Sequence, residues 1–142
     1  METTTQLPKV LYRAKTHTTG GREHGVAKSP DGILDIKLSI PGTGGTGTNP
    51  EQLFAAGWSA CFEGAMKIAA NRKGLSLPED TAIDAEVDLC ADKGEYYLRA
   101  RLNVSIPGVE RNLAQQIIDA SRRICPYSKA VAGNIEAEFN LV

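Results

Sequence analysis

Short apolar stretches alternate with turn residues over the first forty positions, a pattern typical of β-strands. Residues 10–18 are rich in apolar and β-branched side chains, and a second strand-like stretch begins at Arg22. Ser29-Pro30-Asp31-Gly32 is a strong turn signal, and residues 33–40 then alternate apolar with polar side chains. The pattern therefore predicts a three-stranded antiparallel meander.

A long helix is predicted to begin at Thr48 or Asn49 and to end near Gly74. Pro50 suits the first helical position after an Asn49 cap, and Thr48 with Glu51 fits a capping box. Glycine just beyond the last turn is a common C-terminal cap. Small and apolar residues recur at the helical period, namely Leu53, Gly57, Ala60, Cys61, Gly64 and Ile68. We expect a deeply buried central helix whose small residues let another backbone approach closely.

A β-hairpin is predicted to follow this helix. Acidic residues alternate with apolar ones before Asp92-Lys93-Gly94, and basic residues alternate with apolar ones after it. Folding the chain at this turn sets Asp88 opposite Arg99 and Glu86 opposite Arg101, and it aligns the apolar faces. We interpret these charges as a solvated sheet face and expect Cys90, near the turn, to have no role in a site.

Residues 110–124 form an amphipathic pattern that predicts a second helix. Its inward positions are predicted to be Leu113, Ile117, Ala120, Ser121 and Ile124. Pro126 interrupts the helix, a short helix should follow as far as Gly133, and residues 135–142 alternate as a last strand. The order of elements predicts one α+β domain over residues 1–142, with antiparallel sheets and no repeated βαβ unit.

Length and charge exclude several functional classes. The chain has 142 residues and a formal net charge of −1, so it lacks the basic footprint of a nucleic-acid-binding protein. No apolar stretch approaches a membrane span, and residues 1–8 lack the apolar segment of a signal peptide. We therefore expect a cytoplasmic protein, in which permanent disulfides are rare. Because the chain has three cysteines, at least one thiol is unpaired or the pairing is transient.

Two of the cysteines are candidates for thiol redox chemistry. Cys61 lies in the apolar run 53–68, and Cys125 begins Cys125-Pro126-Tyr127-Ser128. A cysteine at a helix start gains amide donors that favour its thiolate, so the local sequence favours Cys125 as the more acidic thiol. The plainer alternative is that each is a buried core cysteine, since free cysteine is among the most buried residue types.

A thiol in an apolar helix is inert unless a nearby charge favours its ionisation. Arg22 and Glu51 are the candidates for this role, because a guanidinium keeps its charge in an apolar pocket and a carboxylate can hold it in position. Alone, Arg22 is most simply a solvated strand charge and Glu51 a capping residue.

Two further motifs lack the context that their chemistry needs. Gly42, Gly44 and Gly47 match the spacing G-x-G-x-x-G, but the helix begins only after the last glycine and no βαβ unit follows, so we expect a turning loop. His17 and His24 could bind a metal together with the thiols, yet neither has a metal-finger spacing. A metal site is therefore not expected.

Taken together, three segments resemble the Ohr branch of the Ohr/OsmC family, whose members confer resistance to organic hydroperoxides. The segments are Thr19-Gly-Gly-Arg22, Thr48-Asn-Pro-Glu-Gln-Leu-Phe-Ala-Ala-Gly-Trp-Ser-Ala-Cys-Phe62 and Cys125-Pro-Tyr-Ser-Lys-Ala-Val-Ala-Gly-Asn134. They occur in order over nearly the whole chain. The hairpin tip that contains Cys90 differs from the glycine-rich tip expected in the family.

The resemblance implies a thiol peroxidase that forms an intertwined homodimer with sites at the subunit interface. It implies that Cys61 is the peroxidatic thiol, Cys125 the resolving thiol, and Arg22 with Glu51 the activating pair. The implied substrates are alkyl and fatty-acid hydroperoxides, and the implied electron donor is dihydrolipoamide or a lipoylated protein, with no bound metal, haem or flavin.

Four apolar side chains near Cys61 are candidates for a substrate pocket that would favour an alkyl tail over hydrogen peroxide. They are Phe54, Trp58, Phe62 and Met66. Ordinary core packing is the alternative for each of them. For the whole chain, two other functions remain open: a redox sensor without turnover, and a ligand- or metal-binding module that uses both thiols and a histidine.

Overall fold

A computed structural model describes residues 7–142 and divides the chain into two compact units, with the boundary between Asn49 and Pro50. The boundary falls where the glycine-rich loop gives way to the long helix. Each unit has its own sheet of three strands. The expected single domain over residues 1–142 stays a prediction.

The first unit contains the predicted antiparallel meander. Its elements are β1 (His17–Thr19), α1 (Gly21–His24), β2 (Val26–Lys28) and β3 (Asp35–Lys37), and the sheet order is β1-β2-β3. Each strand has only three residues, so residues 10–16, predicted as part of the first strand, lie outside β1. An Asx-type turn at Asp31 joins β2 to β3, with the Asp31 carboxylate accepting from the Ile33 N–H at 3.0 Å.

Arg22 does not begin a strand, contrary to the sequence prediction. It lies in the one-turn helix α1, between β1 and β2. The physical reason is the pair Gly20 and Gly21, whose φ angles of 79° and 66° turn the chain into this short helix. Gly25 closes the turn, since a Cβ there would collide with the Gly21 carbonyl oxygen and would lie 2.9 Å from the Thr19 oxygen.

The second unit begins with the long helix α2 (Pro50–Arg72). Both predicted ends are confirmed. At its C-terminus, the Gly74 N–H donates to Asn71 at 3.0 Å and the Leu75 N–H donates to Ala70 at 3.1 Å, which is a Schellman motif. Gly74 has a φ of 77°, the left-handed conformation that this motif requires.

The face of α2 that packs inward is shifted from the predicted one. The side chains buried in this chain are Trp58, Phe62, Ala65, Met66, Ala69 and Ala70. Leu53 and Ile68 of the predicted stripe are 37% and 45% exposed, and Gly64 is also exposed. The reason is that α2 is apolar around most of its circumference, so periodicity alone could not select the face that packs within one chain.

The hairpin of β4 (Ala82–Asp92) and β5 (Glu95–Ser105) has the predicted register. Glu86 pairs with Arg101 and Asp88 with Arg99. Lys93 and Gly94 form the two-residue turn, with φ angles of 53° and 81° as in a type I′ turn. The Arg101 guanidinium donates to both carboxylate oxygens of Asp88 at 3.0 Å, which confirms a polar sheet face.

The chain then continues through α3 (Arg111–Ile124) and α4 (Pro126–Val131) to β6 (Glu136–Leu141). Glu110 caps α3 by accepting from the N–H groups of Asn112 and Leu113. The other strand pairings are antiparallel as expected, but β6 pairs with β5 in parallel, which the sequence did not predict. Because α3 and α4 carry the chain back along the sheet, β6 runs in the same direction as β5.

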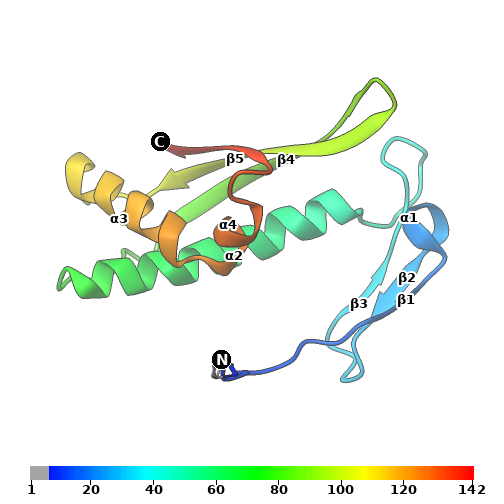
Figure 1. Cartoon of the computed structure of the whole chain (residues 1–142), viewed down its shortest axis with the longest axis horizontal. Coiled ribbons are helices and arrows are strands. Elements are labelled where there is room, and N and C mark those ends of the chain that lie inside the picture. Colours follow the sequence, from blue (N-terminus) through cyan, green and yellow to red (C-terminus); the bar gives the residue numbers. More distant parts are fainter. Residues whose placement is uncertain (1–6) are drawn as a thin grey trace, which may run out of the picture. The chain divides into compact units, whose positions relative to one another are not determined.

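The core of the second unit lies between this sheet and its helices. Figure 1 shows α2 and α3 on the same side of the β4–β5–β6 sheet, with α4 between α2 and the C-terminal strand. Leu102 and Val104 of β5 and Ile117 and Ile118 of α3 have no exposed surface. This packing fixes the middle of α2 against α4, which is where two cysteines meet.

Candidate thiol site

Cys61 and Cys125 lie next to each other although 64 positions separate them in the sequence. Their Sγ atoms are 3.1 Å apart, and both thiols are free. A disulfide has an S–S distance of about 2.05 Å, so a small local movement would bring the sulfurs to bonding distance. Cys61 is half-buried in the middle of α2, whereas Cys125 has no exposed surface. A molecule from solvent therefore reaches Cys61 first.

Cys125 occupies the junction between two helices. Its N–H donates to Ser121 at 2.8 Å at the end of α3, and its carbonyl accepts from the Lys129 N–H at 3.0 Å in α4. Its Sγ accepts from the Ser128 N–H at 3.5 Å, so the side chain caps α4 as the sequence predicted. Pro126 at the first helical position cannot continue α3 and starts the new helix.

The short helix α4 contacts α2 through two neighbouring side chains. The Trp58 Nε1–H donates to Ser128 Oγ at 2.9 Å, and both residues are buried. Tyr127 lies over Gly57, where a Cβ would be 3.0 Å from the tyrosine hydroxyl oxygen. Gly57 thus permits a close approach, but of an aromatic side chain rather than of another backbone. Gly64, another of the small residues predicted to allow a close approach, has open space above it.

Burial raises the pKa of the Cys61 thiol, because a thiolate is poorly solvated in the apolar surroundings of α2. The backbone N–H of Tyr127 acts in the opposite direction, and the neighbouring Cys125 raises the pKa further. The first turn of α4 thus supplies an amide to Cys61 as well as to Cys125. The sequence had suggested such help for Cys125 alone.

Arg22 and Glu51, the predicted activating pair, belong to different units. Arg22 is exposed in α1 of the first unit, and Glu51 lies partly buried in the first turn of α2. Ten residues separate Glu51 from Cys61, which corresponds to about 15 Å along a helix. Glu51 can therefore act on the sulfur only through a longer partner, and the role of both residues stays a prediction.

The four predicted pocket residues take different positions. Trp58, Phe62 and Met66 have no exposed surface and belong to the core, while Phe54 is only partly buried. Phe54 stacks on Trp58 with a centroid distance of 5.5 Å and approaches the Tyr127 ring at 6.2 Å. Core packing accounts for the positions of the three buried side chains. Contact with a substrate stays a prediction for all four residues.

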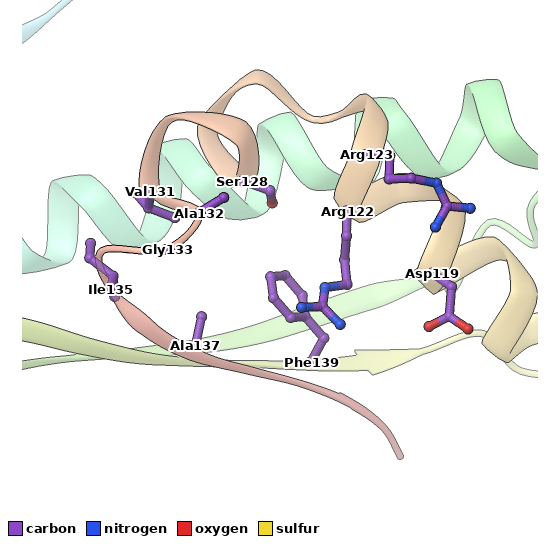
Figure 2. A pocket seen from close by; sticks show the side chains of 10 residues that line it. All are labelled: Asp119, Arg122, Arg123, Ser128, Val131, Ala132, Gly133, Ile135, Ala137 and Phe139. Carbon is purple, nitrogen blue, oxygen red and sulfur yellow. The ribbon is translucent and has the colours of Figure 1, made fainter.

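A hollow that the sequence analysis did not identify lies beside α4. It has a volume of about 500 Å³ and is bounded by α3, α4 and the chain leading into β6 (Figure 2). Among the residues that line the hollow, the guanidinium of Arg122 lies over the Phe139 ring, 4.5 Å from its centroid, in a cation–π contact. Ser128 lines the same hollow. Residues from three separate elements form it, so no local motif could reveal it.

Residues 7–142 contain neither a cluster of metal-binding side chains nor a membrane-spanning helix. No three His, Cys, Asp or Glu side chains among them lie close enough together to hold a metal ion. None of the helices described there is both long and apolar enough to cross a membrane.

Comparison with known proteins places the chain in a family. The model of the OsmC-like protein family matches residues 42–140. The organic hydroperoxide resistance protein of Xanthomonas axonopodis pv. citri is 46% identical over 94% of this chain and 96% of its own length. The chain therefore belongs to the Ohr/OsmC family and, within it, to the organic hydroperoxide resistance branch.

Solved structures agree with this placement. The crystal structure of the organic hydroperoxide resistance protein OhrB of Bacillus subtilis has a TM-score of 0.88 and 38% identity, over 94% of this chain and all of that one. An organic hydroperoxide resistance protein of Legionella pneumophila has a TM-score of 0.85 and 37% identity, over 94% of this chain and 98% of that one. The α+β fold with a long central helix is thus confirmed.

Proposed function

We propose that this chain is a cysteine-based peroxidase that detoxifies organic hydroperoxides. The observation that best supports this proposal is the 3.1 Å distance between the sulfur of the half-buried Cys61 and that of the buried Cys125. This arrangement gives one thiol access to a substrate and keeps the second one ready to react with the product. The names of the relatives, organic hydroperoxide resistance proteins, support the same class of substrate.

The proposed cycle has three balanced steps. The Cys61 thiolate attacks the terminal oxygen of a hydroperoxide, the O–O bond breaks, and the alkoxide takes a proton to leave as an alcohol. The Cys125 sulfur then attacks the Cys61 sulfenic acid, forming the S–S bond and releasing water. A dithiol finally reduces the disulfide by two thiol–disulfide exchanges and becomes a disulfide itself.

Activation of Cys61 is the part of the proposal that needs residues outside α2. Because burial raises the pKa of Cys61, a cation near the sulfur is required to favour the thiolate at neutral pH. Arg22 is the proposed cation, and it also donates to the peroxide oxygens as charge develops on the leaving alkoxide. Glu51 is proposed to hold the guanidinium fork of Arg22 in position.

We further propose that alkyl and fatty-acid hydroperoxides are better substrates than hydrogen peroxide. The apolar surroundings of Cys61, with Phe54 partly exposed about two turns earlier, favour an alkyl chain. The proposed electron donor is dihydrolipoamide or a lipoylated protein, and no bound metal or organic cofactor takes part. A reducing cytoplasm, in which Cys61 and Cys125 return to thiols, suits this cycle.

The active form is proposed to be a homodimer. The stripe predicted from the period of α2 is apolar or small, yet Leu53, Ala60, Gly64 and Ile68 are exposed in the single chain. An apolar helix face of this kind is typical of an interface that a partner covers. Cys61 lies along the same stripe, so a second copy on this face would shape access to the thiol.

Two serine substitutions test the proposed roles. Cys61→Ser should abolish reaction with tert-butyl hydroperoxide, since the atom that attacks the peroxide is absent. Cys125→Ser should react once and then stall as a sulfenic acid that cannot form the intramolecular disulfide. Stopped-flow consumption of peroxide, with trapping of the sulfenic acid by dimedone, separates these outcomes. Loss of the first step in Cys125→Ser alone would show that the two roles are inverted.

A further inference from the structure

We infer that the buried hydrogen bond from Trp58 to Ser128 holds Cys125 in place for disulfide formation, so that Ser128 is a positioning residue of the resolving step. The inference rests on the proposed function. It extends that function by naming the contact that decides whether an oxidised Cys61 is rescued or oxidised further.

The short helix α4, which Cys125 caps, depends on contacts with its neighbours for its position. The helix α4 has only six residues, and a helix of this length is unstable in isolation. It also borders the hollow of about 500 Å³, which Ser128 helps to line, so its packing is incomplete there (Figure 2). Its place is therefore fixed by its neighbours: the Cys125 N–H bond to Ser121 ties its start to α3, and the contacts toward α2 hold the side that carries Ser128.

Two of these contacts form a pair of links between the same elements. Trp58 binds Ser128 at 2.9 Å, and Cys61 contacts Cys125 at 3.1 Å. The two partners on α2 are three residues apart, about 4.5 Å along the helix, and so are the two partners near the start of α4. Two links at this separation fix the orientation of α4 as well as its distance from α2.

Ser128 also contacts the resolving sulfur directly through its backbone. Its N–H donates to Cys125 Sγ at 3.5 Å, while its hydroxyl accepts from the Trp58 indole. A shift of Ser128 away from Trp58 would consequently move the amide that caps the sulfur. The side chain, which is 6% exposed, is the only acceptor found for the buried indole N–H among the described residues. Without the hydroxyl, this N–H would be left unpaired.

The position of Cys125 matters because a sulfenic acid has two competing fates. It forms a disulfide with a nearby thiol or, if a second peroxide arrives first, becomes a sulfinic acid. Holding the Cys125 sulfur close to Cys61 accelerates the first fate by raising the effective concentration of the thiol. The rate of attack on the first peroxide is set by Cys61 and by the groups that shift its pKa, and the Ser128 hydroxyl is not one of those groups.

Ser128→Ala tests the inference in the full chain, with Ser128→Thr as the conservative variant that keeps a hydroxyl. Ser121→Ala is the matched control, because Ser121 is also a buried serine but its hydroxyl donates within α3, to Ile117 at 2.6 Å. The probe is cumene hydroperoxide. The measurements are the rate of Cys61 oxidation, the rate of disulfide formation, and the fraction of protein that gains two oxygen atoms in intact-mass spectra.

We expect Ser128→Ala to form the disulfide about tenfold more slowly, the scale of one buried hydrogen bond, and to accumulate sulfinic acid in proportion. The first oxidation should keep its rate, and Ser128→Thr should recover disulfide formation. Emission from Trp58, the single tryptophan of the chain, should report the loss of its hydrogen bond in Ser128→Ala. Ser121→Ala should behave as the unmodified protein does in both steps.

A disulfide that forms at the unmodified rate in Ser128→Ala would overturn the inference, and so would an equal loss in Ser121→Ala. If Ser128→Ala does not fold, Trp58→Phe removes the same bond from the other side, and its ratio of sulfinic acid to disulfide decides the question. Failure of the unmodified protein to form any Cys61–Cys125 disulfide would instead overturn the proposed function.

Discussion

At the scale of single residues, the two thiols differ in exposure and in position, and the proposed function gives them different tasks. Cys61 is accessible from solvent but burial raises its pKa, whereas Cys125 is fully buried at the start of a helix. A peroxide can therefore meet Cys61, and in the proposed mechanism a cation from outside α2 favours the reactive thiolate. The Tyr127 amide helps, but a neutral donor offsets burial less than a full cation does.

Arg22→Ala should move the ionisation of Cys61 to higher pH. Because removal of the proposed cation leaves only the Tyr127 amide to oppose burial, the thiolate fraction at neutral pH should fall, and the rate of the first oxidation should drop at least about tenfold. The deficit should narrow as the pH rises and the thiol ionises in both proteins. The pH profile of Cys61 alkylation, followed by peptide mapping to separate Cys61 from Cys90 and Cys125, measures the shift.

Arg22→Lys is the matched variant for this measurement, since it keeps the charge and loses the fork of donors. It should retain most of the ionisation effect while reacting more slowly with peroxide. An unchanged alkylation profile in Arg22→Ala would remove Arg22 from thiol activation.

At the scale of elements, the sequence predicted what local chemistry determines. The Asp92-Lys93-Gly94 turn set the register of β4 and β5, and Pro50 and Gly74 marked where α2 begins and ends. Long-range packing decided the rest. The parallel pairing of β6 depends on how α3 and α4 cross the sheet, and the inward face of α2 depends on which neighbours cover it.

The candidate site shows the same division. Both cysteines could be selected from the sequence, because one lies in an apolar helix and the other begins a helix after α3. Their 3.1 Å contact and the Trp58–Ser128 hydrogen bond could not be predicted from the sequence. The first joins residues 64 positions apart, and the second joins residues 70 positions apart. The one-turn helix around Arg22 was missed because its glycines were interpreted only as a break between strands.

Gly25→Ala should disturb α1 and with it the position of Arg22. An added Cβ would collide with the Gly21 carbonyl oxygen, so the turn must open. If Arg22 activates Cys61, this variant should slow the first oxidation as Arg22→Ala does. Gly32→Ala is the control: it strains a positive-φ turn elsewhere in the same unit but meets no atom within 4 Å. The rate of the first oxidation is measured by stopped flow for both variants. A loss in Gly25→Ala alone indicates that the position of Arg22 matters, whereas an equal loss in both indicates only that the first unit is less stable.

At the scale of the whole molecule, α2 carries two apolar faces. One packs against the sheet and α3, and the other, which includes Ile68 at 45% exposure, is open in the single chain. An exposed apolar stripe along the longest helix costs solubility unless something covers it. The proposed homodimer provides that cover and places the surroundings of Cys61 at an interface.

Ile68→Glu should weaken association, because dimer formation would bury an unpaired carboxylate on the apolar stripe. Sedimentation velocity over a range of concentrations should show a shift toward monomer, together with slower peroxide turnover. Gln116→Glu adds the same charge to an exposed position on α3 and should leave association unchanged. Unmodified protein that stays monomeric at every concentration and turns over fully would contradict the dimer proposal.

The central claim is that Cys61 and Cys125 form the redox pair of a peroxidase. The most direct measurement is the intact mass and peptide map after one equivalent of tert-butyl hydroperoxide under anaerobic conditions. We predict the loss of two hydrogen atoms from the protein and a single linked peptide that joins Cys61 to Cys125. Protein that remains unmodified, or a link that involves Cys90 instead, would contradict the account.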